Sequence, residues 1–119
     1  LNIFNANGIW GFDGRDNERR LKMSETIVNK IKDKENVVLA GDFNIQPNTK
    51  TIQNIEHHLK NVFKDELATT FNMTRKINGG YAKAVVDMVF VSKNIKVQEH
   101  FCPNVDISDH LPLVCTLEL

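Results

Sequence analysis

The spacing of apolar positions changes from segment to segment along the chain, and it predicts the secondary structure. Residues 37–40 form a continuous apolar run that ends at Gly41, which is typical of a strand buried on both faces. Residues 1–4 and 84–92 are further apolar stretches, residues 95–101 are expected to be the hairpin partner of 84–92, and residues 111–119 alternate as a last strand. The pattern predicts a sheet.

Two segments have helical spacing instead. The first follows Asp16 or Asn17 as a cap, and the second follows Pro47 with Asn48 or Thr49 as its cap. The stripe of the first helix comprises Leu21, Ser24, Ile27, Val28 and Ile31, and that of the second comprises Ile52, Ile55 and Leu59. Strand, helix and strand in sequence predict a right-handed crossover unit in a parallel or mixed sheet.

Residues 60–83 lose this periodicity and are expected to form a long loop, in which Asn78, Gly79 and Gly80 are among the polar and glycine positions. A long loop inside a compact domain is often functional. Arg75 and Lys76 are therefore its candidate phosphate contacts. The alternative is that both are solvated charges, which are common on protein surfaces.

Composition narrows the class of protein. The 119 residues contain 15 basic and 15 acidic side chains, which indicates one domain, residues 1–119, without a broad polybasic surface for nucleic acid. No apolar run is long enough to span a membrane, and two cysteines favour buried free thiols over a disulfide, so we expect a cytoplasmic protein. Because the chain begins at Leu1, inside an apparent strand, we expect it to be part of a longer protein.

Candidate chemistry begins directly after the central apolar run. Asp42 and Asn44 are two residues apart, so in extended backbone they would share one side of the strand while Phe43 turns inward. Ligands of open α/β sheets bind at the carboxyl ends of strands, and a carboxylate beside an amide suits a phosphate attended by a hard metal ion. The pair is a first indication of phosphoester chemistry.

Asp87 interrupts an otherwise apolar strand, which is costly unless a donor pairs with its carboxylate. His110 is the expected partner, because a carboxylate on one ring nitrogen fixes the tautomer and orientation of a histidine. Asp109, beside it, is an acid at the entrance of a strand and is suited to a divalent cation.

Three short motifs carry a family resemblance. G-D-F-N at residues 41–44, V-D-M-V-F-V-S at 86–92 and S-D-H at 108–110 resemble, in this order, the endonuclease/exonuclease/phosphatase family. The resemblance implies an α+β fold, namely a four-layer α-β-β-α sandwich like that of the pancreatic deoxyribonucleases. This chain would be its carboxyl-terminal half, a mixed sheet with helices on one face. The implied activity is that of a metal-dependent phosphoesterase, which includes nucleases.

The resemblance also implies roles for single residues. Asp42 would orient or deprotonate the attacking water, and Asn44 would hold a phosphoryl oxygen. Asp109 would sit at Mg²⁺ or Mn²⁺. Asp87 would orient His110, which would stabilise the developing charge on phosphorus or share the proton work.

Two departures from the family pattern bear on activity and partners. Where the family often has an asparagine–any–histidine sequence, this chain has Asn7 in place of the histidine, so its amide would bind substrate without transferring a proton. The family's metal-binding glutamate lies in an amino-terminal half that is absent here, so the chain alone is expected to be inactive. We expect a companion polypeptide with that half, or self-association through the uncovered sheet. The alternative to an enzyme is a catalytically silent binding module.

The substrate stays open at this point between phosphodiesters, including nucleic acid, phosphomonoesters and lipid headgroups. Trp10, in an aromatic-flanked loop, is either a platform for stacking a base or a packing residue.

Overall fold

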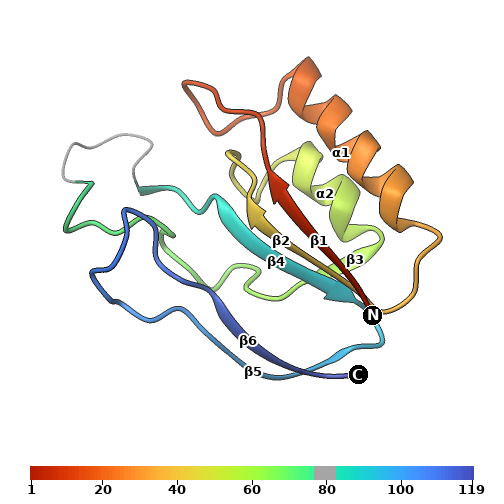
Figure 1. Cartoon of the computed structure of the whole chain (residues 1–119). Coiled ribbons are helices and arrows are strands. Elements are labelled where there is room, and N and C mark those ends of the chain that lie inside the picture. Colours follow the sequence, from red (N-terminus) through yellow and green to blue (C-terminus); the bar gives the residue numbers. More distant parts are fainter. Residues whose placement is uncertain (77–82) are drawn as a thin grey trace.

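Four strands form a mixed sheet in the computed structural model, which describes residues 1–76 and 83–119 (Figure 1). The strands are β1 (Asn2–Asn7), β2 (Val37–Asp42), β3 (Leu59–Asn61) and β4 (Asp87–Ser92), in the order β1-β2-β4-β3. β1 and β2 are parallel, as the crossover predicts, and β4 is antiparallel to both β2 and β3. The predicted loop positions Asn78, Gly79 and Gly80 lie outside the described residues.

Both helices cover one face of this sheet (Figure 1). They are α1 (Glu18–Ile31) and α2 (Lys50–Glu56), and they begin at two of the predicted caps, Asn17 and Thr49. The face beneath them is apolar and at most 2% exposed, through Val37, Leu39, Met88 and Phe90. The prediction of a mixed sheet with helices on one face is confirmed.

A two-stranded ribbon packs on the other face. It consists of β5 (Lys96–Phe101) and β6 (Val114–Glu118), which pair antiparallel with each other. The prediction that residues 95–101 pair with 84–92 is therefore wrong, because β2 and β3 already occupy both edges of β4. Apolar spacing did not predict β3, because Leu59 also fits the helical stripe before it.

Several predicted boundaries also move. β1 continues to Asn7, and β4 begins only at Asp87, so this residue opens its strand rather than interrupting it. The last strand begins at Val114 rather than at residue 111. Cys102 and Cys115 are free, as expected, but they are half-buried rather than buried. Burial raises the pKa of both thiols.

The ribbon does not cover the whole second face. It packs against β4 through Val89 and Val91, whereas Ile3 on β1 points to the same side and is 73% exposed. An apolar residue this exposed in a strand is a candidate contact for another chain. No helix among the described residues is long and apolar enough to cross a membrane.

Candidate active site

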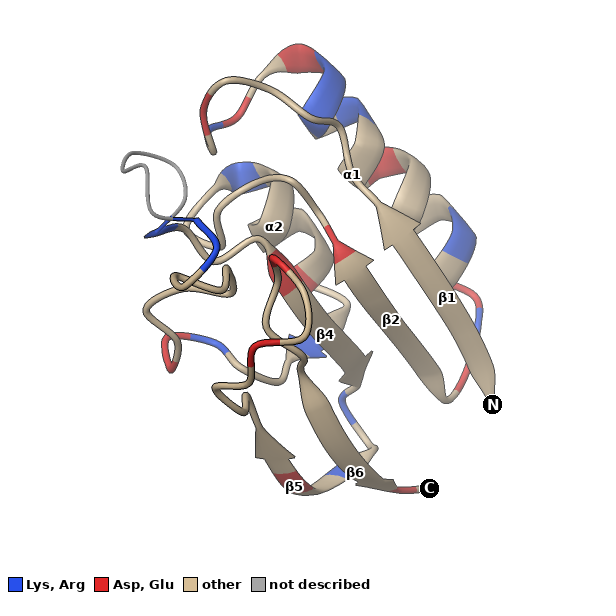
Figure 2. Ribbon diagram, turned by 60° about the vertical axis from the view of Figure 1, so that its left-hand side comes forward, with Lys and Arg blue, Asp and Glu red and all other residues tan. Residues whose placement is uncertain are grey.

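The register of three strands places three polar side chains in one row. Asn7 of β1 is paired with Asp42 of β2, and Asp42 is paired with Asp87 of β4. Their neighbours in each strand, such as Ala6 and Met88, pack towards the helices, so the alternation of a strand turns all three to the opposite face. Figure 2 shows acidic residues gathered where β2 ends and β4 begins.

His110 joins this row from a distant part of the chain. Its Nδ1 lies 2.8 Å from Asp87 Oδ2, and its Nε2 lies 3.9 Å from Asp42 Oδ2. The predicted pairing of His110 with Asp87 is thus present, and its Nε2 faces Asp42. The second distance is too long for a direct hydrogen bond but suits one oxygen atom placed between the two groups.

Asp87 is the most buried carboxylate of this cluster. Burial raises its pKa above the ordinary value, although hydrogen bonds from His110 and Thr70 oppose the rise. A carboxylate buried beside a histidine is typical of a site where orientation matters more than stability.

Asn44 reaches the row by a turn rather than by extended backbone. Its φ is 53°, in the left-handed region that asparagine tolerates, so the expected extended backbone is wrong, although Phe43 is buried as expected. Asp42 Oδ1 instead accepts a hydrogen bond from the Asn44 backbone N–H at 2.8 Å. Asn44 Nδ2 donates to the Gly8 carbonyl at 3.0 Å and lies 3.4 Å from Asn7 Oδ1. The turn brings Asn7, Asp42 and Asn44 together.

Two glycines make this close approach possible. A Cβ on Gly41, whose φ is 152°, would lie 1.9 Å from the Ala6 carbonyl oxygen, and a Cβ on Gly8 would lie 2.0 Å from that of Phe43. Any other residue at either position would force the strand ends apart.

Thr70, which the sequence did not single out, is hydrogen-bonded both to the segment that carries Asp87 and to the segment that carries His110. Its hydroxyl oxygen accepts from the backbone N–H groups of Val86 and Asp87 at 3.0 and 3.2 Å, and its hydroxyl bonds the Asp87 carboxylate. Its carbonyl accepts from the N–H of Leu111 at 2.8 Å. A wholly buried threonine with every polar group in use holds its neighbours in a fixed geometry.

Asn72 does the same for the S-D-H segment. This side chain is 1% exposed, and its Nδ2 donates to the Ser108 carbonyl and to Asp106 Oδ1, both at 2.8 Å. Its backbone N–H donates to the Asp109 carbonyl at 2.9 Å. No periodicity in residues 60–83 marks Thr70 or Asn72, so only the fold reveals them.

The predicted residues Arg75 and Asp109 lie outside the row. Arg75 Nε donates to Asp106 Oδ1 at 2.6 Å, which holds the pKa of that exposed carboxyl below its usual range. Asp109 is half-exposed, with Oδ2 3.5 Å from Lys76 Nζ. The structure therefore brings together Asn7, Asp42, Asn44, Asp87 and His110, and leaves Arg75 and Asp109 at the rim.

The cluster can hold a divalent cation. One ligand atom from each of Asp42, Asp87 and His110 lies within 4.8 Å of the others. Mg²⁺ commonly binds through one or two carboxylates and keeps several waters, and Mn²⁺ also accepts carboxylate ligands. The donor set therefore fits either ion.

Comparison with known proteins identifies the family. The sequence model of the Endonuclease/Exonuclease/phosphatase family matches residues 3–110, which is most of the chain. The chain belongs to this family. The match spans the whole row and ends on His110. A search of the curated proteins found no match.

Solved structures share the fold. An endonuclease/exonuclease/phosphatase from Bacteroides vulgatus is 25% identical, with a TM-score of 0.70 over 91% of this chain and 47% of its own. A mannosyl-6-phosphatase from Bacteroides thetaiotaomicron is 18% identical, with a TM-score of 0.75 over 98% of this chain and 51% of its own. The human Nocturnin catalytic domain, with bound sulfate, is 18% identical, with a TM-score of 0.63 over 98% and 45%. The chain spans about half the length of these structures.

Proposed function

We propose that the chain carries part of the active site of a metal-dependent phosphoesterase, which hydrolyses a phosphodiester or a phosphomonoester. The observation that carries the proposal is the convergence of Asp42, Asp87 and His110, from three separate segments, around one gap of 3.9 Å. Membership of the family supports phosphoester chemistry.

In this proposal the residues divide the work by position. Asp87 holds the Nδ1 side of His110, so that Nε2 points at the gap and can stabilise charge on a phosphoryl oxygen or hand over a proton. Asp42, on the far side of the gap, orients or deprotonates the attacking water. Asn7 and Asn44 line the adjoining edge, where the Asn7 amide N–H can bind a phosphoryl oxygen and Asn44 would have to exchange its contact with Asn7 to do so.

Mg²⁺ or Mn²⁺ is part of the proposal. The ion would be held by carboxylates of the Asp42–Asp87–His110 group. Asp109, the ligand that the family resemblance implies, lies outside this group and would have to leave Lys76 to join it. When bound, it would supply Lewis acidity towards the phosphate. Arg75 is proposed as a substrate contact at the rim, where it would have to exchange Asp106 for phosphate.

The experiment is a hydrolysis assay on bis-p-nitrophenyl phosphate and on p-nitrophenyl phosphate, with Mg²⁺, with Mn²⁺ and with a chelator. We expect metal-dependent turnover that falls by about 10²–10⁴-fold in Asp42→Ala and in His110→Ala. His57→Ala is the matched control, because this exposed histidine lies at the end of α2, away from the row.

The assay is run on the chain itself and on the longer protein that we propose contains it. The family's metal-binding glutamate is expected in the missing half, so the longer protein should turn over and the chain alone should not. Two outcomes would favour the silent binding module. One is that the longer protein shows no turnover, and the other is that its turnover is unchanged by chelator, by Asp42→Ala and by His110→Ala.

The proposed partner surface is the open part of the second face. Ile3 on β1 points to this side and is 73% exposed, as an interface with the missing half or with a second copy requires. Sedimentation of the chain and of its Ile3→Lys variant tests whether two copies associate through this surface. A cytoplasmic location remains a proposal, supported by the two free cysteines.

A further inference from the structure

An exposed aromatic pair stands beside the candidate active site. Trp10 and Phe12 are 66% and 93% exposed, and their rings meet edge to face with centroids 5.1 Å apart. A side chain this exposed is not a packing residue, which was the alternative for Trp10. Rings that face water are unfavourable unless they bind something, so this pair calls for a ligand.

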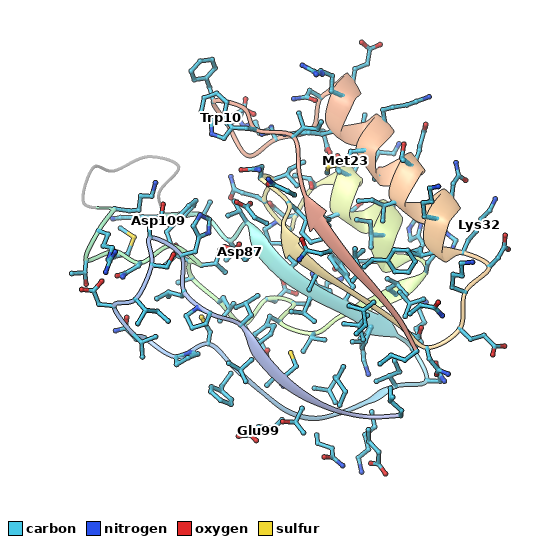
Figure 3. The ribbon with its side chains drawn as sticks, in the orientation of Figure 1. Trp10, Met23, Lys32, Asp87, Glu99 and Asp109 are labelled. Atoms are coloured by element: carbon cyan, nitrogen blue, oxygen red, sulfur yellow. The ribbon has the colours of Figure 1, made fainter. Side chains whose placement is uncertain are left out.

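The pair is tied to the site by the chain itself. Trp10 follows Asn7 by three residues, and a chain extends by at most about 3.6 Å per residue, so their Cα atoms lie within about 11 Å. Figure 3 shows Trp10 at the same end of the sheet as Asp87 and Asp109, whereas Lys32 lies at the opposite end. The upper bound of about 11 Å leaves a base on the rings within reach of a phosphate at the site.

A buried arginine holds the aromatic loop and the site in one frame. Arg20 is wholly buried in α1, and its guanidinium donates to the Ile9 carbonyl at 3.2 Å, to Asp13 Oδ1 at 3.1 Å and to the Arg15 carbonyl at 2.7 Å. Its Nη2 donates to the Asn44 carbonyl at 2.8 Å. The loop that carries the rings is therefore fixed relative to a residue of the site.

The surroundings of Phe12 carry charges of both signs. It lines an open cleft of about 360 Å³ together with Arg15, Lys83 and Asp13. Aromatic rings beside cationic side chains are the combination that binds single-stranded nucleic acid, because bases stack on the rings and phosphates contact the cations. Asp13 and Asp16 in the same loop oppose anionic lipid headgroups and nucleic-acid phosphates alike, although both acids are engaged, Asp13 by Arg20 and Asp16 by Thr51. The exposed rings beside Arg15 and Lys83 favour a base with its phosphate, and a lipid surface is an outcome of the test.

We propose that Trp10 and Phe12 form a stacking platform for a base next to the phosphate that is cleaved, so that the substrate is a short single-stranded oligonucleotide. The proposal rests on the proposed function, which places the phosphate at the row of Asp42, Asp87 and His110. The platform would select the ring-bearing group, and the row of Asp42, Asp87 and His110 would act on the ester.

Intrinsic fluorescence tests the platform directly, because Trp10 is the single tryptophan of the chain. The ligands are a tetrathymidylate and an abasic tetramer with the same phosphates, titrated in chelator so that no hydrolysis occurs. We expect saturable quenching by the tetrathymidylate. Since stacking on one ring changes affinity by about tenfold, the abasic tetramer should bind about tenfold more weakly and quench little.

Variants assign the effect to the pair. Phe12→Ala and Trp10→Leu, measured by anisotropy of a labelled tetrathymidylate, should each weaken binding by about 5- to 10-fold. Phe101→Ala is the matched control, because Phe101 is also an exposed aromatic, 45% exposed, but lies on β5. It should leave the affinity unchanged.

Three results would overturn the platform. The first is that the abasic tetramer binds as tightly as the tetrathymidylate. The second is that Trp10 fluorescence responds to phosphatidylcholine vesicles and not to the oligonucleotide. The third is that the emission shifts to the blue as the protein concentration rises without ligand, as self-association would cause. The assay also separates the two proposals. Base-dependent quenching in a protein that never hydrolyses esters keeps the platform and removes the enzyme, whereas hydrolysis without base dependence does the reverse.

Discussion

The two faces of the central sheet come from the same strands and differ in what they do. In β2, Val37 and Leu39 point to the helices and are at most 2% exposed, while Val38, Ala40 and Asp42 point to the other side and are only partly buried. The helix face is apolar at its centre, through Val37, Leu39, Met88 and Phe90. The opposite face is apolar in the middle and becomes acidic at the strand ends.

This difference separates stability from chemistry along a single strand. Burying an apolar side chain stabilises the fold, whereas burying a carboxylate beside another carboxylate costs free energy. The raised pKa of Asp87, caused mainly by its burial, is a sign of that cost. Substitutions on the helix face should therefore alter stability, and substitutions in the row should alter activity.

The largest effect is expected from Asp87→Asn. In the active protein, this change should lower turnover by about 10²–10⁴-fold, because the amide no longer fixes the tautomer of His110. The free energy of unfolding should stay the same or rise, since a buried charge is removed. Turnover and urea unfolding measured on one preparation check this. A large loss of stability would contradict the division between the faces.

Phe90→Ala is the matching change on the helix face. Phe90 is wholly buried and packs edge to face on Phe43, with ring centroids 5.4 Å apart. Its removal should lower the free energy of unfolding by about 3–5 kcal/mol through the cavity that remains. Urea unfolding measures it, and Phe12→Ala, at a 93% exposed ring, should change stability little.

Thr70→Val tests whether the pair of His110 and Asp87 depends on its support. The change keeps the shape but leaves the N–H groups of Val86 and Asp87 without an acceptor, at a cost of about 1–3 kcal/mol. We expect kcat to fall by about 10-fold with KM almost unchanged, and Thr70→Ser to restore most of it. An equal loss in the serine variant would point to packing rather than positioning.

Asp16→Asn should have the smallest effect, because it changes a helix end outside both faces. Partial burial alone would raise the pKa of Asp16, but hydrogen bonds from Thr51 and Lys50 outweigh it and lower the pKa. Because the pKa of Asp16 is lower in the folded protein than in the unfolded chain, its carboxylate stabilises the fold above about pH 4. This stabilisation is lost as the pH falls through the pKa of the folded protein. The variant should lose about 1 kcal/mol at pH 7 and match the parent in strong acid.

Local patterns in the sequence were enough for most of the fold. Apolar spacing predicted both helices, the parallel crossover of β1 and β2 and the alternation along the last strand. Spacing reports which side of an element is buried, and it does so from neighbours a few residues away. It could not predict that β5 pairs with β6, because that depends on which strand edges remain free after the sheet has formed.

The candidate site divides in the same way. The sequence by itself predicted that Asp87 pairs with His110, and the pair is present, although Asp87 opens β4 instead of interrupting an apolar strand. Only the tertiary structure decided the frame around them. The left-handed turn at Asn44, the buried supports Arg20, Thr70 and Asn72, and the exposure of Trp10 all depend on contacts between segments far apart in the chain, which no local spacing encodes.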